Sequence, residues 1–247
     1  MNRKIVIQFT VLAYIIAFIF WGGLLVFEKF SFTIDEYPLL NLLYLIGAWS
    51  PAIASFVVLR RNNKVSGIKE WLKNIFSFKA SVYNYLFVAA LFVIYVVSLI
   101  VLSGLNRVNP IYMFFIYIPL ALCAGAGMEE VGWRYILQSE LNKKFGYLLT
   151  CLIIAPIHLL WHIPLGIGGL TLWSAMNILG LSFAMGAIHK ISRGNIFLCV
   201  LFHCMVDAAA MTFVFKQTVP GSIITSVLMI AVSIMAVSIN EHILKQR

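Results

Sequence analysis

The sequence predicts an all-α, polytopic membrane protein with about eight transmembrane helices. Its 247 residues are 62% hydrophobic and only 11% charged, whereas a soluble domain carries about a quarter charged residues. Apolar runs of roughly 20 residues recur along the whole chain, and a helix of that length crosses a hydrocarbon core of ~30 Å. The chain is therefore expected to lie in lipid.

Eight such runs can be placed along the sequence. They cover residues 5–27, 39–59, 82–104, 111–141, 146–165, 173–190, 194–216 and 220–241. No composition shift or flexible linker separates them, and the sequence shows no internal repeat. We therefore expect residues 1–247 to form a single integral-membrane domain, with its chemical motifs confined to residues 129–207.

The basic residues fall unevenly on the two sides of these runs. Of the 18 Lys and Arg residues, only Lys29, Arg107 and Lys216 lie on the side opposite the N-terminus, and Arg134 lies inside a run. Cytoplasmic loops of membrane proteins are enriched in Lys and Arg. The pattern predicts a multi-pass protein with both termini in the cytoplasm, and we expect it in the plasma membrane of a bacterium.

The net charge of +9 then reflects membrane topology, so that lipid rather than nucleic acid is the expected partner. Between positions 62 and 80, lysines are interleaved with apolar residues. This segment favours an amphipathic helix on anionic headgroups, with a solvated loop as the alternative.

Three of the apolar runs contain ionisable residues well away from their ends, where such residues are costly in a membrane. A charged side chain at the centre of a bilayer helix costs roughly 2.5–3.5 kcal/mol on insertion scales, so such residues are functional candidates by default. The candidates, in chain order, are Glu129, Glu130, Arg134, His158, His162, His203 and Asp207.

Each candidate also has a structural explanation when it is taken alone. A single intramembrane His can hydrogen-bond a carbonyl, and a Glu–Arg pair can lock two helices together. We favour that explanation for His158, His189 and His242, the last two being expected at helix ends near water. Similarly, Trp21, Trp49 and Trp173 near helix ends are typical of interface anchors. The remaining six ionisable residues on three helices favour function.

Helical geometry assigns the two adjacent glutamates to different surroundings. Glu130 and Arg134 lie one turn apart and are expected to form an ion pair, while Glu129 points away from both. Folding the chain back at the turn near residue 144 brings Glu129 level with His158 and His162. His203 and Asp207 share a face of a third helix and are expected to reach the same depth.

Such a cavity supports two kinds of chemistry. Glu129 could act as a general base on a water molecule, with His203 donating to the oxyanion. Alternatively, Glu129, His162 and His203 could bind Zn²⁺, which would activate the water instead. The absence of H-E-x-x-H, in which one helix supplies two ligands and a base, makes the zinc alternative the less favoured one.

Three motifs resemble those of a known family. They are E-E-x-x-x-R at Glu129–Arg134, the step from Trp161 through His162 to Pro164, and H-x-x-x-D at His203–Asp207. Their order and spacing are similar to those of the CAAX-protease and bacteriocin-processing family, also called Abi, which includes the type II CAAX prenyl endopeptidases. The resemblance implies an eight-helix fold with a conical active-site cavity, and a glutamate mechanism without a metal or other cofactor.

The resemblance also implies a role for each motif residue. Glu129 would be the catalytic base, His162 its partner in activating water, and His203 with Asp207 the oxyanion-stabilising pair. Glu130 and Arg134 would support the site. Two positions depart from the usual motifs: His158 stands where an aromatic residue is usual, and Asp207 where Asn is frequent. An ionised Asp only accepts hydrogen bonds, so oxyanion stabilisation would depend mainly on His203.

The sequence therefore predicts an intramembrane glutamate-type endopeptidase that cleaves near the cytoplasmic membrane face. Its substrate would be a peptide or a prenylated peptide, either of the CAAX type or a bacterial peptide precursor. The first alternative is a non-catalytic membrane protein of bacteriocin self-immunity. The second is an ion-coupled transporter, which predicts an internal repeat that the sequence does not show.

Overall fold

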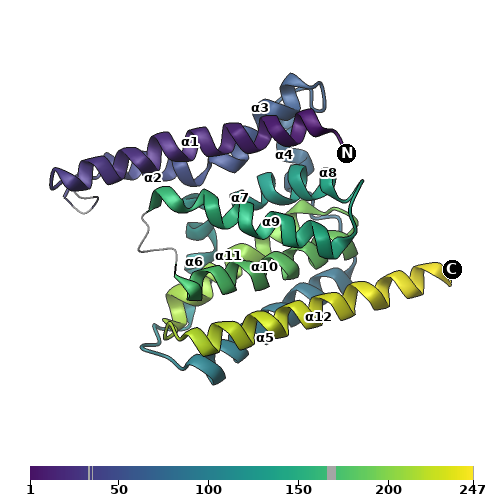
Figure 1. Ribbon diagram of the computed structural model, residues 1–247. Coiled ribbons are helices and arrows are strands. Elements are labelled where there is room, and N and C mark those ends of the chain that lie inside the picture. Colours follow the sequence, from purple (N-terminus) through teal and green to yellow (C-terminus); the bar gives the residue numbers. More distant parts are fainter. Residues whose placement is uncertain (33, 35, 166–170, 247) are drawn as a thin grey trace.

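The computed structural model describes residues 1–32, 34, 36–165 and 171–246, and every regular element in these ranges is a helix (Figure 1). Six helices are long and apolar enough to cross a membrane: α1 (Arg3–Lys29), α5 (Val82–Ser103), α9 (Tyr147–Trp161) with η2 (Ile163–Leu165), α10 (Leu172–Ile191), α11 (Ile196–Phe213) and α12 (Val219–Lys245). Two bent helix pairs raise the number of candidate spans to eight. The predicted all-α polytopic fold is confirmed.

The second and fourth apolar runs are bent, which the sequence analysis did not anticipate. α2 (Leu40–Ala48) meets α3 (Ser50–Arg61) at 54°. α6 (Tyr112–Ala124) meets the segment 126–141 at 47°. The second bend lies at Gly125, whose φ of 108° is a left-handed conformation that favours glycine. The fourth run, residues 111–141, is longer than one bilayer crossing needs. The bend at Gly125 divides it into two helical segments that run in different directions.

The segment after this bend changes its helical winding. It comprises α7 (Ala126–Gly132), a π-helix η1 (Trp133–Gln138) and the short α8 (Ser139–Leu141). π-helical turns are rare and occur frequently at functional sites. Here the π-helix begins at Trp133, three residues after Glu130, and contains Arg134.

α7 packs unusually closely against α11. A Cβ atom on Gly127 would lie 2.6 Å from Cys204 Sγ and 2.8 Å from the carbonyl oxygen of Val200. Only a residue without a side chain permits this approach. The contact places the glutamates of α7 next to His203, the neighbour of Cys204 on α11.

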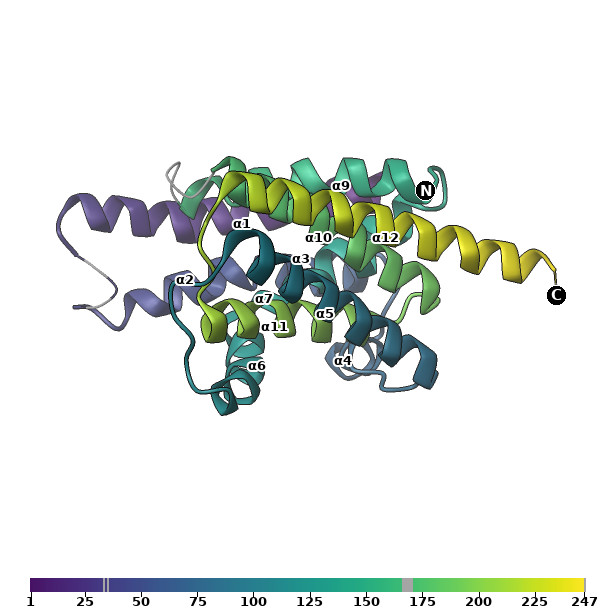
Figure 2. The ribbon, with the colours of Figure 1, turned by 90° about the horizontal axis from the view of Figure 1, so that it is seen from below.

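Both chain termini lie at one end of the helix bundle, and Figure 2 shows the same arrangement from below. The turns α8–α9 and α10–α11 lie at that end, as does the α3–α4–α5 connection. At the other end lie the last residues of α1, α5, η2 and α11 and the first residues of α2, α6, α10 and α12. We refer to these as the terminal end and the far end of the bundle.

The amphipathic segment forms a short helix, α4 (Ile68–Ile75). Its residues Trp71 and Ile75 are buried within the protein, and Trp71 Nε1 donates to Ser55 Oγ on α3 at 3.1 Å. Ile68 and Leu72 are exposed. Half of the apolar face therefore packs onto α3, and only the remainder faces outward.

Candidate active site

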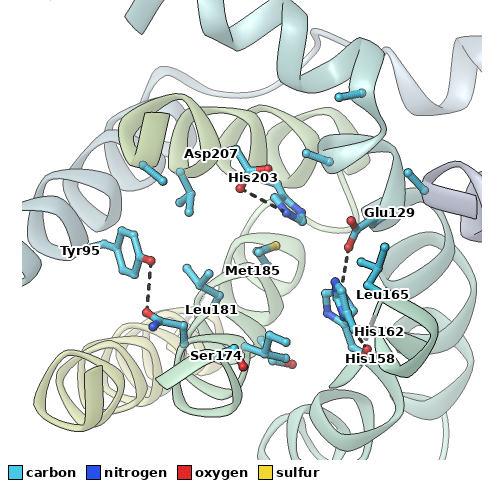
Figure 3. Close-up of a pocket in the computed structure, with 18 of the residues that line it drawn as sticks. Tyr95, Glu129, His158, His162, Leu165, Ser174, Leu181, Met185, His203 and Asp207 are labelled. Atoms are coloured by element: carbon cyan, nitrogen blue, oxygen red, sulfur yellow. Dashed lines mark hydrogen bonds and ion pairs between the residues drawn. The ribbon is translucent and has the colours of Figure 1, made fainter. Parts of the chain in front are cut away.

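A cavity of about 330 Å³ lies between α7, α9, α10 and α11 (Figure 3). Its lining includes side chains from all three predicted motifs, which come from α7 with η1, from α9 and from α11: Glu129, Arg134, His158, His162, His203 and Asp207. The predicted convergence of three helices on one cavity is therefore present in the structure.

Glu129 is held by His158. Both side chains are buried, and Glu129 Oε2 lies 2.8 Å from His158 Nε2. A carboxylate in a low dielectric is costly without a hydrogen-bond partner, and the imidazole supplies one. The sequence analysis counted His158 among the candidates and placed it at this depth, although it favoured a structural role for this residue taken alone. In the structure His158 contacts Glu129 directly.

His162 lies one turn further along α9, where it caps the helix. Its Nδ1 lies 3.0 Å from the backbone oxygen of His158. Because a carbonyl oxygen only accepts hydrogen bonds, this contact requires the proton on Nδ1. In the neutral ring Nε2 then carries a lone pair, which can accept a proton from water or bind a metal ion.

Within the described part of the chain, one group of potential metal ligands stands out. Single ligand atoms of Glu129, His158 and His162 all lie within 4.8 Å of one another. A carboxylate and two imidazoles are a known set of catalytic zinc ligands. The sequence-based zinc alternative named His203 as the third ligand, whereas the structure brings His158 into that position.

Tryptophan rings surround the two histidines. The ring of Trp133 is centred 5.1 Å from that of His158, and the ring of Trp161 lies 4.8 Å from that of His162. Trp21 is buried, packs 4.5 Å from Trp161 and donates from Nε1 to the oxygen of Tyr44 at 2.9 Å. The prediction that Trp21 is an interface anchor is therefore wrong, because its ring helps to fix α9 beside the cavity.

Glu130 lies on the other side of α7 and forms the predicted ion pair. Its Oε2 lies 2.6 Å from Arg134 Nε, and both side chains are fully buried. Arg134 Nη1 also donates to Gln138 Oε1 at 3.2 Å, and Gln138 donates in turn to the oxygen of Gly186 on α10. This buried network joins η1 to α10 beneath the cavity.

The second carboxylate oxygen of Glu130 holds His203. His203 Nδ1 lies 2.9 Å from Glu130 Oε1, and since a carboxylate accepts, Nδ1 is the donor. On the other side of the ring, Nε2 lies 3.9 Å from Asp207 Oδ1. Glu130 therefore bridges Arg134 and His203, and it orients the ring with Nε2 toward Asp207 (Figure 3).

The wall that faces the histidines carries a polar pair absent from the predicted site. Tyr95 Oη on α5 lies 3.3 Å from Asn177 Oδ1 on α10 (Figure 3). Asn177 also donates to the oxygen of Trp173 at 3.0 Å. The sequence did offer one signal for this pair, since Asn177 is a polar amide within an otherwise apolar helix. Nothing in the local sequence connected it with Tyr95.

The comparison with protein families decides the assignment of this site. Residues 110–209 match the family described as Rce1-like, type II CAAX prenyl endopeptidase. This segment belongs to the CAAX protease family. The match contains every one of the site motifs and indicates a protease, a hydrolase, within a multi-pass membrane protein. No curated protein matches the chain.

The remaining candidates of the sequence analysis are spread over the helix bundle. Trp173 lines the cavity, and Trp49 donates to the oxygen of Cys123 at 3.0 Å. His189 was expected near water but is buried on α10, 3.3 Å from Ser139 Oγ. His242 lies on the exposed end of α12 beside Gln246. Neither His189 nor His242 lines the cavity.

The cavity opens at the end of the bundle opposite the chain termini. Leu165, Ser174 and Ala210 belong to the lining and lie near the far-end limits of η2, α10 and α11. Both termini lie at the opposite end (Figure 1). Cytoplasmic termini and a cavity that opens to the cytoplasm therefore exclude each other. The sequence analysis held both expectations because counting residues from the turn at residue 144 gives a depth but not a direction of opening.

Proposed function

We propose that the protein is an intramembrane glutamate-type endopeptidase in which Glu129 is the general base. The observation that supports this is the contact of Glu129 with His158 inside a cavity that also receives His162 and His203. A carboxylate placed within reach of a cavity water can take its proton as the oxygen attacks a peptide carbonyl.

In the proposed reaction Glu129 acts first as a base and then as an acid. Glu129 accepts a proton from water, and the water oxygen bonds to the carbonyl carbon to give a tetrahedral oxyanion. His203, when doubly protonated, donates from Nε2 to that oxyanion, because its Nδ1 is committed to Glu130. The carbon–nitrogen bond then breaks, and Glu129 returns the proton to the leaving amine.

The other residues position these groups. His158 orients the Glu129 carboxylate, and the Nε2 lone pair of His162 can hold the water. Glu130 and Arg134 fix the His203 ring from below, while Asp207 lies beside its Nε2. An ionised Asp207 only accepts hydrogen bonds, so it cannot donate to the oxyanion and acts on it only through His203.

A metal ion would change the origin of the nucleophile. Glu129, His158 and His162 would hold it, and it would lower the pKa of a bound water. We propose the metal-free mechanism. Protein freed of metal by a chelator, with its metal content verified by elemental analysis, is expected to cleave at an unchanged rate. A loss of about 100-fold or more that Zn²⁺ restores would establish the metal mechanism instead.

For the substrate, we propose a peptide with apolar side chains around the scissile bond. Trp21, Tyr44 and Ile178 contribute to a lining that is largely apolar apart from the catalytic groups. Such walls suit apolar residues or a lipid chain. The two classes to be compared are therefore prenylated CAAX peptides and unprenylated peptide precursors.

The test is cleavage of both peptide classes by purified protein. Glu129→Gln keeps the shape and polarity of the side chain but removes the base, so the rate should fall by about 10²–10⁴-fold. Glu28→Gln is the matched control, because Glu28 is exposed near the end of α1 and outside the cavity. Folded Glu129→Gln protein that cleaves at the wild-type rate would exclude the proposed base.

A further inference from the structure

The cavity has a closed floor and an open rim. Arg134, Ser182 and Met185 line it toward the terminal end, and all three are 0–1% exposed. At the other limit, Leu165 is 39% exposed and the Asp207 side chain 45% exposed. Exposure therefore increases from the terminal end toward the far end.

Helix positions give the same direction. His158 precedes the last residue of α9, Trp161, by one turn, which is roughly 5 Å at the rise of an α-helix. The first residue of α9, Tyr147, lies at the terminal end about 16 Å away by the same rise. The catalytic groups are thus close to the far end of the bundle, and the thicker part of the protein separates them from the termini.

Charge distinguishes the two ends. In the described ranges, the basic residues of the far end are Lys29, Arg107 and Lys216. Apart from the buried Arg134, the other described Lys and Arg residues belong to segments at or next to the terminal end. Because basic loops are retained on the cytoplasmic side, the terminal end is the cytoplasmic one. The rim of the cavity then faces the opposite compartment.

We propose that the cavity is loaded from the extracytoplasmic face and that its substrate is an exported or externally anchored peptide. The proposal rests on the function proposed above and adds the side of entry. An extended peptide can approach between the ends of η2, α10 and α11, with Leu165, Trp173 and Ala210 at the entrance. This favours a peptide precursor over a prenylated peptide held on the cytoplasmic leaflet.

The side of entry can be measured without any catalytic activity. In a Cys123→Ser background, which removes the exposed native thiol, single cysteines are placed at the rim and at the terminal end. Leu165→Cys and Ala210→Cys report the rim, and Lys64→Cys and Lys144→Cys report the terminal end. A charged, membrane-impermeant thiol reagent is then applied to intact cells and to permeabilised cells.

The rim cysteines are expected to react in intact cells, and the terminal-end cysteines only after permeabilisation. The reverse pattern, or rim cysteines that react only after permeabilisation, would overturn the proposal. The same labelling in a Glu129→Gln protein should be unchanged, because the reporter depends on topology and not on turnover.

A second measurement connects the side of entry with cleavage. An impermeant apolar peptide that purified protein cleaves should be cleaved by right-side-out vesicles and at least 10-fold more slowly by sealed inside-out vesicles. Preferential cleavage by inside-out vesicles would overturn the proposal. If purified protein cleaves no peptide, the proposed protease function fails, and the thiol labelling still determines the side on which the cavity opens.

Discussion

Two adjacent glutamates illustrate how much of the site is determined by side-chain direction. Glu129 points to α9 and contacts His158, while Glu130 points to α11 and bridges Arg134 and His203. Helical geometry predicted this separation from the sequence. It did not predict that Glu130 also holds His203, because that contact depends on how closely α7 and α11 approach.

Substitution of the two glutamates should separate stability from activity. Glu130→Gln leaves a buried Arg134 without its counter-ion, and breaking a buried pair in this way costs about 3–5 kcal/mol. We expect the thermal midpoint in detergent to fall by about 6–20 °C. Glu129→Gln should leave the midpoint within a few degrees of wild type while abolishing cleavage. Equal midpoints for the two variants would contradict the assigned network.

His158 provides a second test at this scale, because it acts on the reaction only through Glu129. His158→Phe introduces the aromatic character usual for the family but removes the hydrogen bond to Glu129 Oε2. We expect the cleavage rate to fall by roughly 10–100-fold, as for other residues that orient a catalytic ligand. His158→Gln, whose amide can donate from a similar position, should recover most of the rate. Equal cleavage rates for His158→Phe and His158→Gln would show that the packing of this side chain matters and its hydrogen bond to Glu129 does not.

At the scale of helices, the apolar runs were predictable and their bends were not. Hydropathy located all eight runs, since lipid requires about 20 apolar residues for each crossing. The break at Gly125 and the π-helix of residues 133–138 follow from contacts with other helices. A sequence pattern of apolar residues is nearly the same for a straight helix and a bent one.

The close approach of α7 to α11 makes a specific prediction about Gly127. Alanine in an exposed helix usually stabilises relative to glycine by about 0.5–1 kcal/mol. Gly127→Ala should instead destabilise by about 1–3 kcal/mol, because its methyl group would overlap Cys204 Sγ and a backbone oxygen of α11. Thermal unfolding in detergent measures the change. Gly22→Ala is the control, since Gly22 also lies inside a helix, α1, and no atom lies within 4 Å of its added Cβ.

A neutral or stabilising effect of Gly127→Ala would mean that α7 and α11 are further apart than described. The predicted loss should extend to cleavage, because displacement of α7 separates Glu130 from His203. Gly22→Ala should leave cleavage near wild type and stability at or slightly above it.

At the scale of the molecule, the sequence predicted the number of crossings and the position of both termini at one end. It did not predict that the cavity opens at the end opposite the termini, because neither hydropathy nor residue counting shows which end of a bundle is open. That information comes from the exposure of Leu165 and Asp207 against the burial of Arg134 and Met185. Charge and cavity direction together are the basis of the proposal that the peptide enters from the extracytoplasmic side.

The central claim is that side chains from separate helices meet in one cavity and act as a unit. A double-mutant cycle of the cleavage rate tests it most directly, with Glu129→Gln on α7, His162→Ala on α9 and the combined variant. Residues that act together are strongly non-additive, so the double variant should be within about 3-fold of the slower single variant. A double variant whose loss equals the product of the two single losses would contradict the account.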